Sequence, residues 1–140
     1  MIHAKNALPV NMIQWVAATG GVKKGQLVKS ATGAAPVAAA HEGATLLGVA
    51  VADAAQATAA TIIPLRGTLL EIDYRPGRTK MSCTAADLGV LYDMYVDSTT
   101  GEMFIDLDDT TGGYLFIVGY DNIKKKAFCV VDDADLLLSI

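Results

Sequence analysis

GATLLGVAVADAAQATAATIIPLRGTLLEIDY, residues 43–74, is the stretch that decides the fold. It begins with an apolar run of small and β-branched residues at 46–52, and a second apolar run follows at 61–65 after a spacer of Ala, Gln and Thr. The last part alternates strictly and places three side chains on one face: Leu70, Ile72 and Tyr74. Because successive side chains of a strand point to opposite sides of a sheet, this alternation predicts a half-buried strand.

The C-terminal half continues in the same manner. Apolar and polar residues alternate at 91–97 and at 102–108, and the turn at 98–101 joins them, which predicts a β-hairpin with one buried face. A strongly apolar strand is expected at 114–120, and its partner strand at 127–131. For the C-terminal tail, DDADLLLSI, the pattern leaves open a last strand or a helical turn.

Shorter elements complete the predicted fold. Strands are expected at 13–18 and 26–29, and a weak edge strand at 36–40. Thr84 and Asp87 have the T-x-x-D spacing of a helix start, so one short helical turn is expected there. The predicted fold class is all-β: a small β-barrel or β-tulip-like domain with an extended N-terminal arm.

A faint internal repeat accompanies this pattern. Two stretches of the first half resemble two of the second: 24–33 resembles 92–101, and 46–54 resembles 116–124. The second pairing is a resemblance around Gly48 and Gly119, which match when one residue is skipped. We therefore predict one β domain at 13–140, with a pseudo-repeat of 20–74 and 88–135 inside it.

Composition limits the size and the partners of the protein. A chain of 140 residues suits one domain, and a hydrophobic content of 52% favours an oligomer. The net charge of −4 gives no reason to expect nucleic-acid binding, and no run reaches the roughly 18 apolar residues of a membrane helix. Residues 1–60 carry four basic and two acidic residues, hence +2; residues 61–140 carry seven and thirteen, hence −6.

Two groups of residues are candidates for contacts. The first is the arm at 1–12, which is either a frayed tail or a segment lying on a partner. The second reading rests on four residues that are unusually apolar for a free tail: Ile2, Leu8, Val10 and Met12. The second is a basic cluster, either a solvated loop or a contact for an acidic surface: Arg66, Arg75, Arg78 and Lys80. The single Trp15 is read as a core residue more readily than as a binding hot spot.

Catalytic chemistry is not indicated. The two histidines have no acid–base partner nearby in sequence, and neither a nucleophile elbow nor a phosphate-binding glycine loop is present. Cys83 and Cys129 lack metal-ligand spacing and are read as reduced, buried thiols. We therefore expect no enzyme activity, no cofactor and no metal.

Three segments resemble the capsid decoration, or cement, proteins of tailed double-stranded DNA bacteriophages. These segments are GGVKKGQLVKS at 20–30, LLGVAVADA at 46–54 and TIIPLRGTLLEI at 61–72. The resemblance covers roughly residues 13–131. It implies a β-barrel or β-tulip-like subunit that assembles as a homotrimer on the outside of the virion head and holds neighbouring major capsid subunits together.

The resemblance leads to a hypothesis about contacts. Ile13 and Trp15, with the arm before them, are expected to contact the capsid protein, and the basic cluster is expected to meet acidic capsid or subunit surface. Deletion of 1–12 should then weaken capsid binding and leave the fold intact. The alternatives are another virion β-protein, such as a head fibre base or tail accessory, and a small ligand-binding β-barrel.

Overall fold

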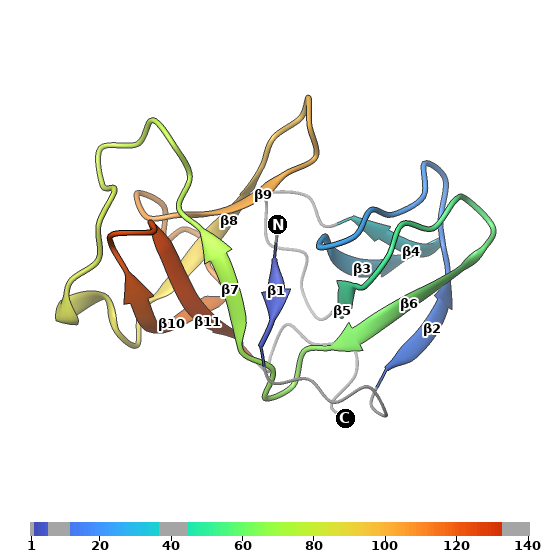
Figure 1. The fold of residues 1–140 in the computed structure, drawn as a ribbon, viewed down its shortest axis with the longest axis horizontal. Helices are drawn as coiled ribbons and strands as arrows, with labels where there is room; N and C mark the ends of the chain where they lie inside the picture. Colours follow the sequence, from blue (N-terminus) through green and yellow to red (C-terminus); the bar gives the residue numbers. More distant parts are fainter. Residues whose placement is uncertain (1, 6–11, 37–44, 133–140) are drawn as a thin grey trace.

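Two β-sheets make up the protein in a computed structural model, which describes residues 2–5, 12–36 and 45–132. One sheet has the strand order β2-β6-β5-β3-β4 and contains β2 (Ile13–Val16), β3 (Leu27–Ala31), β4 (Gly33–Pro36), β5 (Leu46–Ala50) and β6 (Ala59–Pro64). The other has the order β1-β7-β11-β10-β8-β9 and contains β1 (His3–Ala4), β7 (Leu70–Asp73), β8 (Leu91–Val96), β9 (Met103–Asp106), β10 (Leu115–Asp121) and β11 (Lys126–Val131). Figure 1 shows the two sheets side by side, with β1 at the edge of its sheet, next to β7 and facing the other sheet. The fold is all-β, which confirms the predicted class.

The two sheets share one topology. When β2 to β6 are matched in chain order with β7 to β11, the order β2-β6-β5-β3-β4 becomes β7-β11-β10-β8-β9. Both sheets also curl in the same way. In each, a parallel bridge joins the first and third of the five matched strands: Ala17 with Ala34, and Tyr74 with Ile105. We call β2–β6 the first unit and β7–β11 the second unit.

Hydrogen bonds next to these bridges support the correspondence. Ala18 N donates to Ala34 O and Arg75 N donates to Ile105 O, each at 2.9 Å. The predicted copies at 20–74 and 88–135 therefore need a corrected boundary. β7 opens the second unit instead of closing the first, because it pairs with β11 and β1. The uninterrupted apolar character of residues 61–74 hides this boundary in the sequence.

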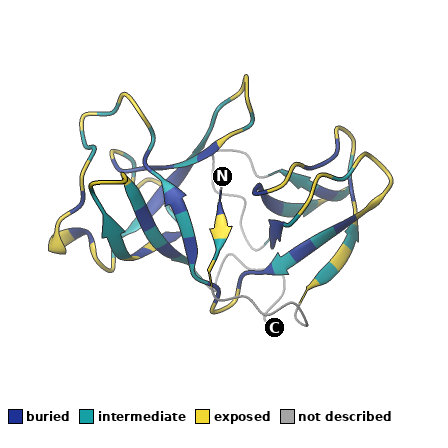
Figure 2. Ribbon diagram, viewed as in Figure 1, coloured by how far each residue is buried: buried dark blue, intermediate teal, exposed yellow. Residues whose placement is uncertain are grey.

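Most of the core is shared between the units. The inner face of the second unit forms one large cluster, which contains the three alternating residues Leu70, Ile72 and Tyr74, as predicted. Leu46 and Val49 of β5 belong to the same cluster, whereas Leu47 and Ala50 face a smaller core inside the first unit. All five residues of β5 are consequently buried, which explains its continuous apolar run. Figure 2 shows this burial along the central strands and exposure on the loops.

Residues 2–5 are part of this body, although they belong to the predicted separate arm at 1–12. β1 pairs with β7 in the register His3–Glu71, and Ile2 N donates to Gly25 O at 3.0 Å. The side chain of Ile2 is 2% exposed and lies in the shared core. The prediction that Ile2 contacts a partner is therefore wrong, because its own domain already buries it.

Of the shorter predicted elements, the helical turn is confirmed and the edge strand has different bounds. The short helical turn is a 3₁₀ turn, η2 (Ala85–Asp87), with Thr84 as its N-cap and a complete capping box, as the T-x-x-D spacing predicted. The weak edge strand begins earlier than expected, as β4, because Gly33 has φ +95° and turns the chain directly after Ala31. Residues 37–40 and the tail from 133 lie outside the described residues.

Candidate functional site

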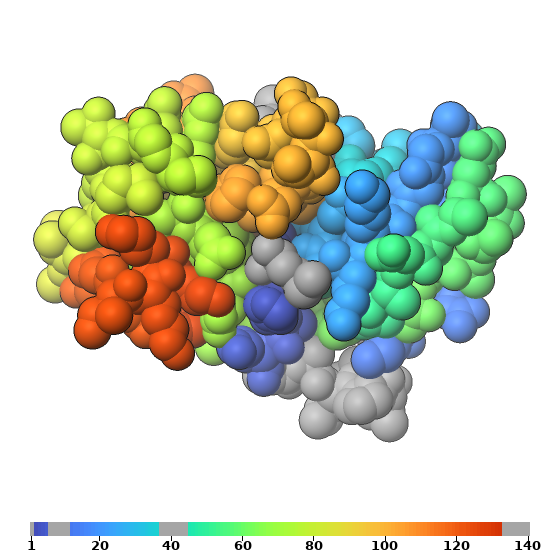
Figure 3. Space-filling model, turned by 45° about the horizontal axis from the view of Figure 1, so that its top comes forward, coloured from blue at the N-terminus to red at the C-terminus, as the bar shows by residue number. Residues whose placement is uncertain are grey.

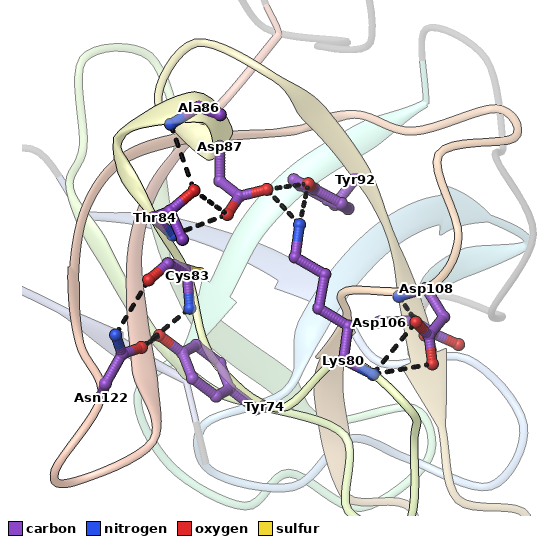
Figure 4. A network of polar contacts seen from close by, with 10 residues as sticks. All are labelled: Tyr74, Lys80, Cys83, Thr84, Ala86, Asp87, Tyr92, Asp106, Asp108 and Asn122. Atoms are coloured by element: carbon purple, nitrogen blue, oxygen red, sulfur yellow. Dashed lines mark hydrogen bonds and ion pairs between the residues drawn. The ribbon is translucent and has the colours of Figure 1, made fainter.

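The long connection between β7 and β8, residues 74–90, carries most of the predicted basic cluster. Figure 4 shows that Lys80 Nζ points at the carboxylate of Asp87 and at the hydroxyl of Tyr92, which lies 3.0 Å away. Tyr92 also donates its hydroxyl proton to Asp87, and Thr84 N donates to the same carboxylate at 2.7 Å. The connection is thus fastened to β8 by a polar network around one buried carboxylate.

This network sets the charge states of its members. Burial raises the pKa of Asp87, but the hydrogen bonds from Lys80, Tyr92 and the Thr84 backbone outweigh it and lower the pKa to about 2. Burial lowers the pKa of Lys80, but its contacts with Asp87 and Tyr92 outweigh that effect and raise it. With the pKa of Asp87 lowered and that of Lys80 raised, both groups are charged at neutral pH, and the ion pair fastens the connection to β8.

Arg75 and Arg78 have similar internal partners. Arg75 Nη1 lies 2.7 Å from one carboxylate oxygen of Asp106, and Arg78 Nε lies 3.0 Å from the other. The Arg75 guanidinium also lies 3.5 Å from the centre of the Tyr95 ring. The structure thus brings three of the predicted basic residues together and pairs their charges with carboxylates of the same chain, while their side chains stay partly exposed; their contact with a partner stays a prediction.

The two thiols are unsuited to nucleophilic chemistry. Burial raises the pKa values of Cys83 and Cys129, so both remain protonated. The backbone of Cys83 is bracketed by Asn122, whose side chain accepts from Cys83 N at 2.8 Å and donates to Cys83 O at 2.9 Å. Tyr74 donates to the same Asn122 oxygen at 2.9 Å. The arrangement fixes the loop to the β10–β11 turn.

The remaining predicted contact residues lie apart from this network. Arg66 is exposed on the turn between β6 and β7. Met12 is 37% exposed, and Ile13 and Trp15 are half-buried where they pack against the small core of the first unit. Trp15 is therefore a partly covered core residue. Leu8 and Val10 lie outside the described residues.

An apolar surface that sequence reasoning missed lies on the outer face of the second unit. Phe116, in β10, is flanked across the strands by Leu91 of β8 and Val130 of β11. These three residues line a shallow hollow of about 300 Å³. Val118, at a β-bulge two residues further on, is 48% exposed, and Leu88 is 45% exposed. We call this set, Leu88, Leu91, Phe116, Val118 and Val130, the outer apolar face.

A signal for this face was present in the sequence. The strand expected at 114–120 is apolar at nearly every position, although a strand with one solvated face should alternate. Its inward residues, Leu115 and Ile117, fill the shared core, so Phe116 and Val118 lie exposed on the opposite face. An exposed apolar cluster of this kind typically marks an interaction site.

Metal-binding and membrane-spanning features are absent from the described part of the chain. No group of three or more His, Cys, Asp or Glu residues is placed to hold a metal ion among residues 2–5, 12–36 and 45–132. Within those ranges no helix is long and apolar enough to cross a membrane.

A scan against protein-family models finds no matching family, and a search of curated proteins finds no match.

Proposed function

We propose that this chain is a non-enzymatic structural protein of a virion, which binds the outer surface of an assembled phage capsid as a trimer and stabilises contacts between major capsid subunits. The observation that carries the proposal is the outer apolar face, most of which lies on the paired strands β8, β10 and β11, with Asp132 at the edge of its hollow. Such a surface serves adhesion between proteins. The resemblance of residues 20–30, 46–54 and 61–72 to decoration proteins supplies the partner.

The energetic logic fits a cement protein. A ligand that binds only the assembled shell stabilises that shell by mass action. A trimer attaches through three equivalent contacts, so its avidity exceeds that of any single contact. Arg75, Arg78 and Lys80 are paired internally but partly exposed, and together with the exposed Arg66 and Met12 they supply the contact with the capsid.

Co-sedimentation with undecorated heads of the source phage tests the proposal. We expect saturable binding, in multiples of three copies per local threefold position, and greater resistance of the decorated heads to heat. Bovine serum albumin at equal concentration serves as the control for trapping in the pellet. Absence of binding to both expanded and unexpanded heads would overturn the proposal and favour a fibre-base or tail role.

A further inference from the structure

The two units bury equivalent positions to different degrees. Matching the bridge residues Ala17 and Tyr74 places Ile13 on Leu70 and Trp15 on Ile72. Leu70 and Ile72 are completely buried, whereas Ile13 and Trp15 are only half-buried. The inner side of the second unit is therefore closed, and the inner side of the first unit is partly open.

The closing element of the second unit is the first unit itself. Leu27 of β3, with Leu46 and Val49 of β5, faces away from the small core of the first unit and lies in the shared core with Leu70 and Ile72. Leu27 N also donates to Met103 Sδ at 3.1 Å. Figure 3 shows the β8–β9 hairpin (orange) against the segment of the first unit that leads into β3 (blue). The outer face of the first unit thus packs on the inner side of the second unit.

The same outer strands are uncovered in the second unit. β8 and β10 correspond to β3 and β5, and the outer apolar face lies on them. We propose that the outer apolar face of one copy packs on the open inner side of the first unit of a second copy, around Ile13 and Trp15. The contact would repeat between copies the packing that already exists within the chain.

The distribution of charge along the sequence favours this head-to-tail arrangement over a symmetric one. Pairing two outer apolar faces would bring two halves of charge −6 together, whereas head-to-tail pairing places a −6 half against a +2 half. A head-to-tail contact closes into a ring when the rotation per copy allows it. The inference rests on the trimer of the proposed function and names the two surfaces that build it.

The first experiment measures mass and tryptophan emission of the full chain across a concentration series. Association should raise the mass above 14.6 kDa and shift the emission of Trp15, the only tryptophan, to the blue. Val118→Asp should remain a monomer with unshifted emission. Ile123→Asp, a matched change at a residue that is 96% exposed on the β10–β11 turn, should associate like the wild type. A wild-type chain that stays monomeric up to its solubility limit overturns the inference, as does equal dissociation by Ile123→Asp.

Mixing two defective chains tests the head-to-tail geometry. Val118→Asp keeps its open inner side, and Trp15→Ser keeps its outer apolar face, so their mixture should form a complex of two chains. The single tryptophan of that complex should shift to the blue. Ile13→Asn replaces Trp15→Ser if the latter loses its β circular dichroism. A mixture that remains monomeric, or an Ile13→Asn chain that associates normally, contradicts the geometry.

These experiments distinguish failure of this inference from failure of the proposed function. An oligomer that forms through these surfaces but does not bind heads leaves the inference standing and removes the capsid role. A monomer that binds heads does the reverse.

Discussion

At the scale of single residues, Ile2 shows how an N-terminal side chain can belong to the core. It has no periodic neighbours in sequence, so its burial depends on the pairing of β1 with β7, which residues nearly seventy positions away provide. Isolated apolar residues carry no signal about which distant face will cover them. The arm was for this reason predicted as a contact element, although its first described residues stabilise the body.

Ile2→Ala should lower the free energy of unfolding by about 3 kcal/mol, because it removes a fully buried side chain and leaves a cavity. Ile123→Ala makes the same truncation at an exposed position and should change it by less than about 0.5 kcal/mol. Urea unfolding monitored by circular dichroism measures both. Equal stability of the two variants would show that Ile2 does not occupy the core.

Two carboxylates with lowered pKa values predict that the protein loses stability at acid pH. The pKa of Asp87 falls from 3.8 to about 2. The pKa of Glu71, which accepts hydrogen bonds from Lys5 and Lys126, falls from 4.5 to about 2. A depressed folded-state pKa stabilises the protein above the ordinary value, and this contribution is lost as the pH falls toward 2. We expect the free energy of unfolding to decline between about pH 4.5 and 2, with Asp87 contributing at most about 2 kcal/mol.

The Asp87→Asn variant isolates the contribution of Asp87 to this pH dependence of stability. The difference in stability between wild type and variant should be largest near pH 6 and should shrink as the pH approaches 2. Urea titrations at a series of pH values, at constant ionic strength, measure it. A difference that stays constant over this range would mean that the Lys80–Asp87 pair does not depress the carboxyl pKa.

At the scale of elements, the two glycines that the sequence overlay aligned differ in their surroundings. A Cβ on Gly48 would collide with the backbone oxygen of Ile63 and lie 2.8 Å from its carbonyl carbon, whereas a Cβ on Gly119 would lie 3.5 Å from Phe128 Cδ2, an ordinary contact. Gly48→Ala should therefore cost about 3 kcal/mol or force β5 and β6 apart, and Gly119→Ala should cost less than about 1 kcal/mol. Thermal unfolding of both variants checks this, and an equal cost would refute it.

Strands and turns were predictable where local pattern decides them. The alternation from Leu70 to Tyr74, the hairpin turn at 98–101 and the capping box at Thr84 all depend on residues close in sequence. The basic cluster was interpreted differently from what the structure shows, because its partner Asp106 lies 28 residues from Arg78 and only the fold brings them together. The outer apolar face required knowledge of which strands lie side by side.

At the scale of the whole molecule, the repeat of two units with a shared core determines how the protein unfolds. The first unit supplies Leu46 and Val49 to the cluster that fills the second unit, so the second unit has no complete core without the first, and these two side chains lose their cover without the second. The only tryptophan lies in the first unit, and all five tyrosines lie in the second. Each unit therefore carries its own spectroscopic reporter.

We expect Trp15 emission and the tyrosine near-ultraviolet circular dichroism to change in one transition with the same denaturant midpoint, because loss of either unit exposes the shared core of the other. Leu46→Ala should shift both midpoints together. Val28→Ala, which truncates a residue in the small core alone, should also shift both, since an unfolded first unit uncovers Leu70 and Ile72. Two separated transitions, with the tyrosine signal persisting after the tryptophan signal is lost, would mean that the second unit is stable without its cover.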